Sequence, residues 1–257
     1  QDMMGRTAIM LAAGAGHHDI VYLLLQNNAD IHLVTKDKKT LLHFAAFGNL
    51  TDLITKLVDE GLDVDAQAVT GETPMHFGVC NGDIQTVESL LMGGANAKIL
   101  DNGGKSVMHI AARDCHDMQV IKTLLLEGIN INIKYSDGST PLIWAAQGGY
   151  PQVLKYLIDN GADPHARTKY GRSALHYASK SNKNIKVCDM LLNAGLDINA
   201  PDKNGYTGLM LSVQSGNAKM VKYLTDRHAD VNMRSDDGKM AMHMVAKDNT
   251  STAIPNQ

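Results

Sequence analysis

Histidine is the residue type whose number and spacing in this chain point first to chemistry. The 257 residues include 11 histidines, and five of them stand three residues after a Thr, a Ser or, in the last case, a Met. These five are His43, His76, His109, His176 and His243. A hydroxyl beside an imidazole suggests a nucleophile with its base, and several imidazoles suggest a metal site.

Neither chemistry fits a pairing that recurs along the chain. A metal ion needs ligands that converge within ~2 Å of it, whereas equivalent residues of neighbouring packed helices lie roughly 10 Å apart. A catalytic nucleophile and base form a single constellation with a third, orienting group. We therefore predict that each imidazole hydrogen-bonds the nearby hydroxyl or a loop carbonyl. We expect no catalytic residue, no cofactor and no metal, so the chain is predicted not to be an enzyme.

Three cysteines, Cys80, Cys115 and Cys188, are too few and too scattered for a disulfide framework. Their odd number leaves at least one unpaired, so we expect reduced thiols and an intracellular protein. We predict that Cys80 and Cys115 face solvent at helix-turn positions. A reactive thiol needs positively charged surroundings, and only Arg113 and His116 flank Cys115, which makes a redox role the weaker interpretation.

Two further features resemble functional motifs without the context that those motifs need. The adjacent pairs His17-His18 and Cys115-His116 have metal-ligand residue types, but neighbours on a chain do not point at one ion, so we interpret them as surface side chains. Segment 102–106, Asn-Gly-Gly-Lys-Ser, looks like the end of a phosphate-binding loop. Such a loop follows a strand, and no strand pattern precedes this one.

Composition excludes several other classes of protein. Hydrophobic residues make up 44% of the chain, which is too high for disorder. The net charge of −3 gives no sign of the positive field that nucleic acid would require. No apolar run approaches the ~20 residues of a membrane-spanning helix. Because the chain starts with Gln1 and has no signal-peptide pattern, we expect it to be a piece of a longer chain.

The elements that position these residues follow from an internal repeat. Eight positions that open a helical pattern recur at an almost constant interval along the whole chain, and a fixed period of this kind indicates a repeat architecture. The eight positions, called anchors below, are Thr7, Thr40, Thr73, Ser106, Thr140, Ser173, Thr207 and Met240.

Every repeat has the same internal pattern. A pair of small residues such as Ala45-Ala46 follows each anchor by five places, and apolar doublets such as Leu53-Ile54 and Leu57-Val58 come later at helical spacing. A small pair suits a close approach of two backbones. Each repeat is therefore predicted to be two short antiparallel helices. The second ends at a Gly in the left-handed conformation, and a hairpin-like loop with another Gly leads to the next repeat.

This pattern resembles the ankyrin repeat, whose period and Thr-Pro-Leu-His core it shares. The matching segments are Thr73-Pro74-Met75-His76, Thr40-Leu41-Leu42-His43, Ser106-Val107-Met108-His109, Thr140-Pro141-Leu142-Ile143 and Ser173-Ala174-Leu175-His176. The resemblance implies an all-α fold, an ankyrin-repeat solenoid of helix-turn-helix units with β-hairpin-like loops, whose concave side carries the first helices and hairpin tips. We expect the array to cover 1–248, with repeats starting near 2, 35, 68, 101, 135, 168, 202 and 235, the last one incomplete, and a tail or truncated cap over 249–257.

Some repeats depart from the pattern. Two intervals, from Ser106 to Thr140 and from Ser173 to Thr207, are one place longer than the others. We assign the extra residue to the turn between the paired helices, at 113–117 and 180–184. Asn28 and His228 replace the Gly after the second helix, and His228 is the poorer substitute. Lys38 replaces the hairpin Gly of the second repeat, so we expect a less regular hairpin there.

A stacked array offers a surface rather than a deep pocket. Interfaces are enriched in Trp, Tyr and Arg, and three successive repeats carry these residues at projecting positions; Trp144 stands where we expect it to be half-buried. We predict a non-enzymatic interaction module or scaffold that binds another protein or peptide, not nucleic acid, in the cytoplasm. The alternative is a regulatory or targeting arm of a larger enzyme, channel or toxin, with membrane contact only through parts of that parent chain. The candidate partner-binding residues are Ser136, Asp137, Trp144, Lys169, Tyr170, Arg172, Lys203 and Tyr206.

The resemblance also implies a modification. Ankyrin arrays in animal cells can be hydroxylated on a hairpin Asn that lies eight residues after a Leu. Asn132, Asn199 and Asn232 fit this spacing. The alternative is that these side chains only make the turn hydrogen bonds that Asn favours.

Overall fold

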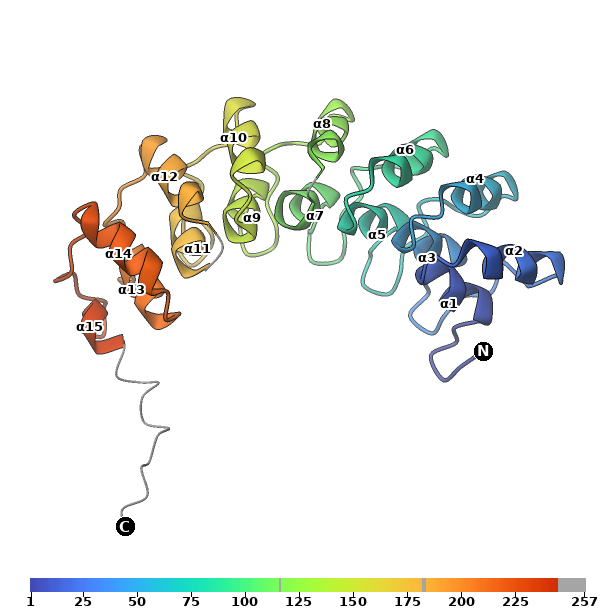
Figure 1. The fold of residues 1–257 in the computed structure, drawn as a ribbon, viewed down its shortest axis with the longest axis horizontal. Coiled ribbons are helices and arrows are strands. Elements are labelled where there is room, and N and C mark those ends of the chain that lie inside the picture. The colour runs from blue at the N-terminus through green and yellow to red at the C-terminus, as the bar shows by residue number, and fades with distance from the viewer. Residues whose placement is uncertain (116, 182–183, 245–257) are drawn as a thin grey trace, which may run out of the picture. The chain divides into compact units, whose positions relative to one another are not determined.

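The computed structural model describes residues 1–115, 117–181 and 184–244, and these ranges contain 15 helices and no strand (Figure 1). The helices come in pairs that follow the repeat, and the last is a single short helix. Their bounds are α1 Ala8–Gly14, α2 His18–Gln26, α3 Leu41–Phe47, α4 Thr51–Asp59, α5 Pro74–Cys80, α6 Ile84–Met92, α7 Val107–Asp114, α8 Met118–Leu126, α9 Pro141–Gly148, α10 Pro151–Asp159, α11 Ala174–Lys180, α12 Ile185–Asn193, α13 Gly208–Gln214, α14 Ala218–Asp226 and α15 Ala241–Met244.

The chain divides into two compact parts, and each is described by itself. The N-terminal part, Gln1–Ser136, holds α1 to α8, and the C-terminal part, Asp137–Gln257, holds α9 to α15. Within each part the first helices of successive repeats pack on one another, as α1, α3, α5 and α7 do in the N-terminal part. The second helices form another layer beside them. The predicted all-helical repeat of helix pairs is confirmed.

The first helix of a repeat begins at the anchor because the anchor caps it. Thr7 Oγ1 accepts a hydrogen bond from the Met10 N–H (3.4 Å), and Pro74 and Pro141 occupy first-turn positions, where a missing N–H costs nothing. The small pair that follows is fully buried in the second repeat, where it consists of Ala45 and Ala46. Only small side chains let neighbouring first helices approach this closely.

The second helix of a repeat also contributes large apolar side chains to the core. In the N-terminal part Leu57, Leu90 and Leu124 occupy the same place in successive repeats, and each is fully buried. Burying one leucine is worth about 2 kcal/mol. Stability therefore comes from stacking rather than from the short helices themselves.

The left-handed positions lie where the sequence places them. Gly61 and Gly94 have φ of 86° and 88° just after their helices, and Asn28 and His228 adopt the same conformation at 58° and 63°. The prediction of an irregular hairpin at Lys38 is wrong. Lys38 takes φ of 62°, and its N–H donates to the Thr35 carbonyl (2.9 Å), as the Gly71 N–H does to the Ala68 carbonyl (2.8 Å). The hairpin hydrogen bonds thus hold a lysine in a conformation that normally favours glycine.

Replacing Lys38 with glycine should therefore stabilise the protein. The left-handed conformation costs a non-glycine residue about 1–2 kcal/mol, while the entropy that glycine adds to the unfolded chain offsets roughly half of this. We expect Lys38→Gly to raise the free energy of unfolding by about 0.5–1 kcal/mol in urea denaturation. Asn28→Gly is the matched control, because asparagine tolerates this conformation. An equal gain in both variants would contradict the explanation.

The extra residue of the two longer repeats was predicted to lie in the turn between the paired helices, and the helix bounds confirm this for the sixth repeat, between α11 and α12. In the fourth repeat α7 instead runs one residue further, to Asp114, and the stretch before α8 is no longer than in the third. In the second repeat α4 begins at Thr51, and the distance from the anchor Thr40 to this residue is the reference for the other repeats. In the fourth repeat α8 begins at Met118, which is one place further from its anchor Ser106, and α12 is displaced by the same amount in the sixth. A left-handed residue in the turns of the shorter repeats was not predicted from the sequence. Positive φ is found there at Gly16, Asn49, Gly82, Gly149 and Gly216.

Some predictions lie outside the described residues. The tail over 249–257 and the end of the eighth repeat beyond Met244 belong to this group. In the ranges that are described, no helix has the length and apolar character that crossing a bilayer requires.

Candidate partner-binding surface

The recurring histidines cap the first helices and link neighbouring repeats. In the second repeat the Thr40 N–H donates to His43 Nδ1 (3.1 Å), the Thr40 hydroxyl lies 3.0 Å from the same nitrogen, and His43 Nε2 lies 3.1 Å from the Glu72 carbonyl oxygen. His176 makes the same set of contacts with Ser173 and the Tyr206 carbonyl. Since Nδ1 accepts, Nε2 carries the proton and donates to the carbonyl. The predicted structural role of these imidazoles is confirmed.

Burial keeps these imidazoles neutral. Desolvation lowers the pKa of His43 and of His176 to about 4, from an ordinary 6.5, although the carbonyl that accepts from each ring acts in the opposite direction. The pKa of His76 is also lowered, again mainly by burial. Such imidazoles are poor proton acceptors near neutral pH, so they are unsuited to general-base work.

The cysteines correct one expectation. Cys80 is exposed as predicted, but Cys115 is fully buried, and its thiol lies 3.3 Å from the Asp117 carbonyl oxygen. Burial raises the pKa of Cys115 to about 11 and also raises the pKa of Cys80. A thiol with a raised pKa is a poor nucleophile.

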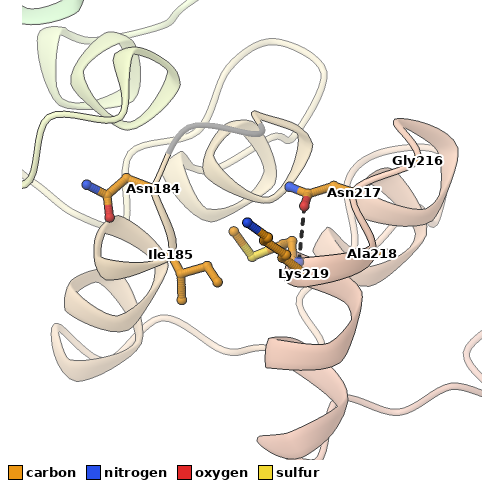
Figure 2. A pocket seen from close by; sticks show the side chains of 7 residues that line it. Asn184, Ile185, Gly216, Asn217, Ala218 and Lys219 are labelled. Carbon is orange, nitrogen blue, oxygen red and sulfur yellow. Dashed lines mark hydrogen bonds between the residues drawn. The ribbon is translucent and has the colours of Figure 1, made fainter.

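The C-terminal part has a hollow beside the turns between its paired helices, and we considered it as a candidate site. Its volume is about 530 Å³, and its walls come from the starts of α12 and α14 (Figure 2). Asn217 Oδ1 accepts from the Met220 N–H (3.1 Å), so that side chain already caps α14. Among the described residues of the lining, Lys219 is the single ionisable one. Over the described ranges, no three His, Cys, Asp or Glu side chains gather as a metal site would need.

The hairpin tips of the C-terminal part project in a regular row, and we call the backbone hydrogen bonds that join them the ladder. Backbone hydrogen bonds join each tip to the next: the Lys169 N–H donates to the Asp137 carbonyl (2.7 Å), the Lys203 N–H to the Tyr170 carbonyl (2.9 Å), and the Asp236 N–H to the Asn204 carbonyl (3.0 Å). Side chains of successive tips are therefore held in a fixed row. We call Lys169, Tyr170 and Lys203 the tip patch.

The tip patch is exposed and combines an aromatic ring with positive charge. Tyr170 is 51% exposed, and the Lys169 ammonium lies 5.2 Å from the centre of its ring, within reach of a cation–π interaction. Lys169 and Lys203 are also exposed. An exposed aromatic side chain on a rigid backbone is a common interface anchor.

Comparisons with known proteins agree with this architecture. Models of ankyrin repeats match residues 1–68, 42–135, 108–202 and 191–245. The chain belongs to the ankyrin-repeat family. Among solved structures, it is similar to the ankyrin repeat domain of human ASB11, with a TM-score of 0.71, 25% identity and coverage of 88% of this chain and 99% of the other.

Ankyrin-containing relatives are much longer than this chain. It is 26% identical over 79% of its length to a putative palmitoyltransferase, ZDHHC13, of Danio rerio, of which the match covers 32%. It is 28% identical over 80% of its length to the transient receptor potential cation channel subfamily A member 1 of Homo sapiens, covering 19% of that protein. The nuclear factor NF-kappa-B p105 subunit of Gallus gallus is 32% identical over 62% of this chain, and the match covers 16% of it.

Several predicted site residues of this ankyrin array have structural roles. Arg172 Nε donates to Asp202 Oδ2 (2.9 Å), and Asp202 Oδ1 accepts from the Asn204 and Tyr206 N–H groups at 2.9 and 3.0 Å. The Asp202 side chain is only 1% exposed. Burial by itself would raise the pKa of Asp202, but Arg172 and the two N–H groups outweigh it and hold that pKa below its ordinary value. Arg172 therefore compensates a buried carboxylate.

Trp144 is half-buried, as expected. Its Nε1 donates to Ser139 Oγ (2.9 Å), and the Ser139 hydroxyl donates to Asp137 Oδ1 (2.5 Å). This chain of hydrogen bonds fixes the first hairpin tip of the C-terminal part. Tyr206 is also half-buried, while the eighth candidate, Ser136, is exposed and belongs to the N-terminal part.

Asp202 lies beside the candidate residues Arg172 and Lys203, but its role was not predicted from the sequence. The turn signal was present, because an Asp followed by Lys-Asn-Gly is typical of a side chain that accepts from its own turn. Asp101 has the same role in the N-terminal part, where its Oδ1 accepts from the Gly103 N–H (2.9 Å). The ion-pair partner of Asp202, Arg172, stands in the preceding hairpin, so local pattern does not reveal it.

Asp202→Ala should destabilise the C-terminal part. The change removes two turn hydrogen bonds and leaves Arg172 without its partner, and breaking a pair of this kind costs about 2–4 kcal/mol. Urea unfolding measures the loss. Asp202→Asn should lose less because an amide oxygen still accepts both N–H bonds. Asp236→Ala, an exposed acid in the next tip, is the matched control; equal losses at Asp202 and Asp236 would disprove the role of the pair.

Proposed function

We propose that this ankyrin array is a non-enzymatic interaction module or scaffold that binds another protein or peptide through the hairpin tips and first helices of its C-terminal part. The observation that supports the proposal most strongly is the exposed tip patch on a hydrogen-bonded ladder. A surface that is ordered before binding loses little conformational entropy when a partner docks. The proposal includes an intracellular, cytoplasmic location and a partner other than nucleic acid or metal.

Exposure and hydrogen bonding favour three of the candidate residues for this binding. Lys169, Tyr170 and Lys203 are exposed and make no ion pair among the described residues. The candidates that are half-buried and bonded into the scaffold would change folding together with binding when substituted; they are Arg172, Tyr206, Trp144 and Asp137. The patch carries two lysines and an aromatic ring, which favours a partner segment with carboxylate groups next to an apolar side chain.

The test compares partner recovery by matched variants of the whole chain. Affinity purification from the cells of origin, with proteomic identification, is expected to recover a reproducible partner with the parent chain. The triple variant Lys169→Glu/Tyr170→Ser/Lys203→Glu should recover at least tenfold less of this partner. Lys186→Glu/Lys219→Glu changes two exposed lysines of the second helices and should retain it. Equal recovery by both variants would remove the tip patch from the proposal.

A second candidate function is favoured by the relatives. Palmitoyltransferase and cation-channel relatives contain the matching ankyrin array as 32% and 19% of their length. In this alternative proposal the chain is a regulatory or targeting arm of a larger enzyme, channel or toxin. The complete transcript distinguishes the two: a catalytic or membrane-spanning pattern in the same reading frame supports the arm, and its absence from the full transcript supports the separate scaffold.

We also propose that Asn132, Asn199 and Asn232 are candidates for hydroxylation. Asn199 Oδ1 accepts from the Asp230 N–H (2.8 Å), which gives that side chain a structural role, whereas Asn232 is exposed. Asn232 is therefore the position of the three at which an enzyme reaches the side chain most easily. Mass spectrometry of the protein from its native cells tests this: a peptide with one added oxygen at Asn232 supports it, and fully unmodified peptides refute it.

A further inference from the structure

Three exposed lysines gather on one rim of the C-terminal part, at the turns between paired helices. Lys186 and Lys219 stand at the starts of α12 and α14, and Lys180 ends α11. These turns are joined, because Asn217 Nδ2 donates to the Ser181 carbonyl (3.3 Å). We call Lys180, Lys186 and Lys219 the lysine rim. It lies at the opposite end of the first helices from the hairpin tips, so it is separate from the tip patch.

No carboxylate balances the lysine rim. Segments 180–188 and 213–225 contain no Asp or Glu, and none of the three lysines forms an ion pair within the described ranges. By contrast, the Nζ of Lys155 on α10 lies 2.7 Å from Asp159 Oδ2. The rim therefore holds an excess of positive charge, although the whole chain has a net charge of −3.

Helix electrostatics make lysine an unfavourable residue at two of these positions. The start of a helix carries partial positive charge, which favours acidic side chains. Lys186 and Lys219 are the second residues of α12 and α14. The second residues of α2 and α4 are Asp19 and Asp52 instead. All four side chains are exposed, so packing does not dictate the choice. Stability of the fold does not account for lysine here, whereas a bound anion would balance it.

The lysine rim borders the hollow between the starts of α12 and α14. The described residues of its lining include Asn184, Asn217 and Lys219, and the Lys219 side chain extends from α14 toward α12 (Figure 2). Lys186 lies two residues after Asn184, whose Oδ1 accepts from the Lys186 N–H (3.0 Å). A volume of about 530 Å³ accommodates side chains of a short peptide segment.

The chain itself indicates the chemistry of the occupant. Asp83 Oδ2 caps α6 by accepting from the Thr86 N–H (3.1 Å). Asp117 Oδ1 caps α8 by accepting from the Gln119 N–H (2.8 Å). Neutral asparagine side chains cap α12 and α14 instead. We propose that the lysine rim binds an acidic peptide segment of a partner protein, whose carboxylates supply the negative charge that Asp supplies at other helix starts.

Two features favour a peptide over an anionic membrane. A hollow between helix starts admits single side chains, whereas a bilayer surface is flat. Binding to a membrane surface also gains from apolar side chains that insert between the lipids. Over the described residues of segments 180–188 and 213–225, no large apolar side chain is exposed. Binding at the lysine rim therefore rests on charge, and it should weaken as the salt concentration rises.

Fluorescence anisotropy of a labelled hexaglutamate peptide tests the proposal on the whole chain. The parent protein should bind the peptide, and Lys186→Gln/Lys219→Gln should weaken the affinity at least about tenfold because two charge contacts are lost. Glutamine already occupies this place in α6 and α8, as Gln85 and Gln119, so the urea midpoint should not fall. A parent chain that does not bind, or unchanged affinity in the variant, would overturn the proposal.

A matched control removes the same charge from the same layer of helices. Lys155→Gln/Lys222→Gln changes two lysines that already pair with Asp159 and Asp226. This variant should bind the peptide within about twofold of the parent affinity, since exposed ion pairs contribute little. An equal loss in both double variants would show that only net charge matters, and the lysine rim would no longer be a site.

Two further arms identify the occupant and the surface. Vesicles of equal parts phosphatidylserine and phosphatidylcholine should sediment equal amounts of the parent chain and of Lys186→Gln/Lys219→Gln. Rim-dependent sedimentation without rim-dependent peptide binding would make the occupant a membrane and overturn the proposal. The tip-patch variant Lys169→Glu/Tyr170→Ser/Lys203→Glu should still bind the peptide. Loss in that variant, with binding retained in the rim variant, would move the acidic segment to the tips: it would overturn the lysine rim and leave the proposed function standing.

Discussion

Acidification from pH 6.5 to 4 should greatly lower the free energy of unfolding of this protein. Above pH 6.5 these histidines should cause no loss of stability. His43 in the N-terminal part and His176 in the C-terminal part both have a pKa lowered to about 4 by burial. In the unfolded chain both return to about 6.5. One pKa unit corresponds to about 1.4 kcal/mol. Between pH 6.5 and 4, each histidine therefore lowers the free energy of unfolding by on the order of 3 kcal/mol.

The sign follows from which state binds the proton first. Between pH 6.5 and 4 the unfolded chain holds a proton on each imidazole and the folded chain does not, so the free energy of unfolding falls as pH falls. Below pH 4 both states are protonated, and these histidines cause no further loss. The structural reason is that Nδ1 already accepts from the anchor N–H. A proton added there would face a donor and break the cap.

Urea unfolding at closely spaced pH values measures this slope, with far-UV circular dichroism as the signal. His176→Met supplies the control, because Met10 and Met210 occupy the same place in two other repeats and are almost fully buried. The variant should be less stable at pH 7, since Ser173 and the Tyr206 carbonyl lose their partner, but its slope should be smaller by about one proton. An unchanged slope in His176→Met would show that this histidine titrates normally.

The structural role of the histidines could be predicted because it depends on local spacing. The imidazole meets the anchor three residues before it on the same helix turn, and the repeat itself supplies the loop carbonyl. The chain also shows what is lost when the histidine is absent: with Ile143 in its place, Thr140 Oγ1 is buried without a hydrogen-bond partner within the described part of the protein. Period and helix pairing were predictable for the same reason, since each repeat mainly contacts its neighbours.

Cys115 shows where local pattern fails. In the shorter repeats a left-handed residue such as Gly82 reverses the chain between the two helices. The fourth repeat has one more residue, and Cys115 takes an extended conformation with φ of −82° and ψ of 132°. That backbone directs its thiol into the core. Sequence spacing revealed the insertion but not which side chain the altered turn would bury.

The partner-binding residues were the least predictable part. Residue type selected Arg172 and Tyr206 as projecting side chains, yet the first pairs with Asp202 of the following hairpin and the second is half-buried. Whether a projecting position is free depends on side chains of the next repeat, which the local pattern does not fix. The ladder uses the backbone groups of the tip patch, which leaves its side chains exposed.

Gly48→Ala should detach the first repeat from the array. Gly48 ends α3 with φ of −87°, a conformation open to any residue, so backbone strain plays no part. An added Cβ would lie only 1.8 Å from the Ala13 carbonyl oxygen and 3.1 Å from the Gly16 nitrogen. Both contacts are with backbone, so no side chain can rotate away. The turns of the first two repeats must separate, which costs about 2–4 kcal/mol by overpacking.

The loss should be local because each repeat contacts only its neighbours. Hydrogen exchange should accelerate at least about tenfold in α1 and α2, while α5 to α8 keep the parent rates. Gly61→Ala separates overlap from conformational preference: Gly61 has φ of 86°, but a Cβ there meets nothing within 4 Å. It should cost about 1 kcal/mol from strain alone. If Gly48→Ala leaves exchange in α1 unchanged, the close approach of these two turns is not what fixes the first repeat in place.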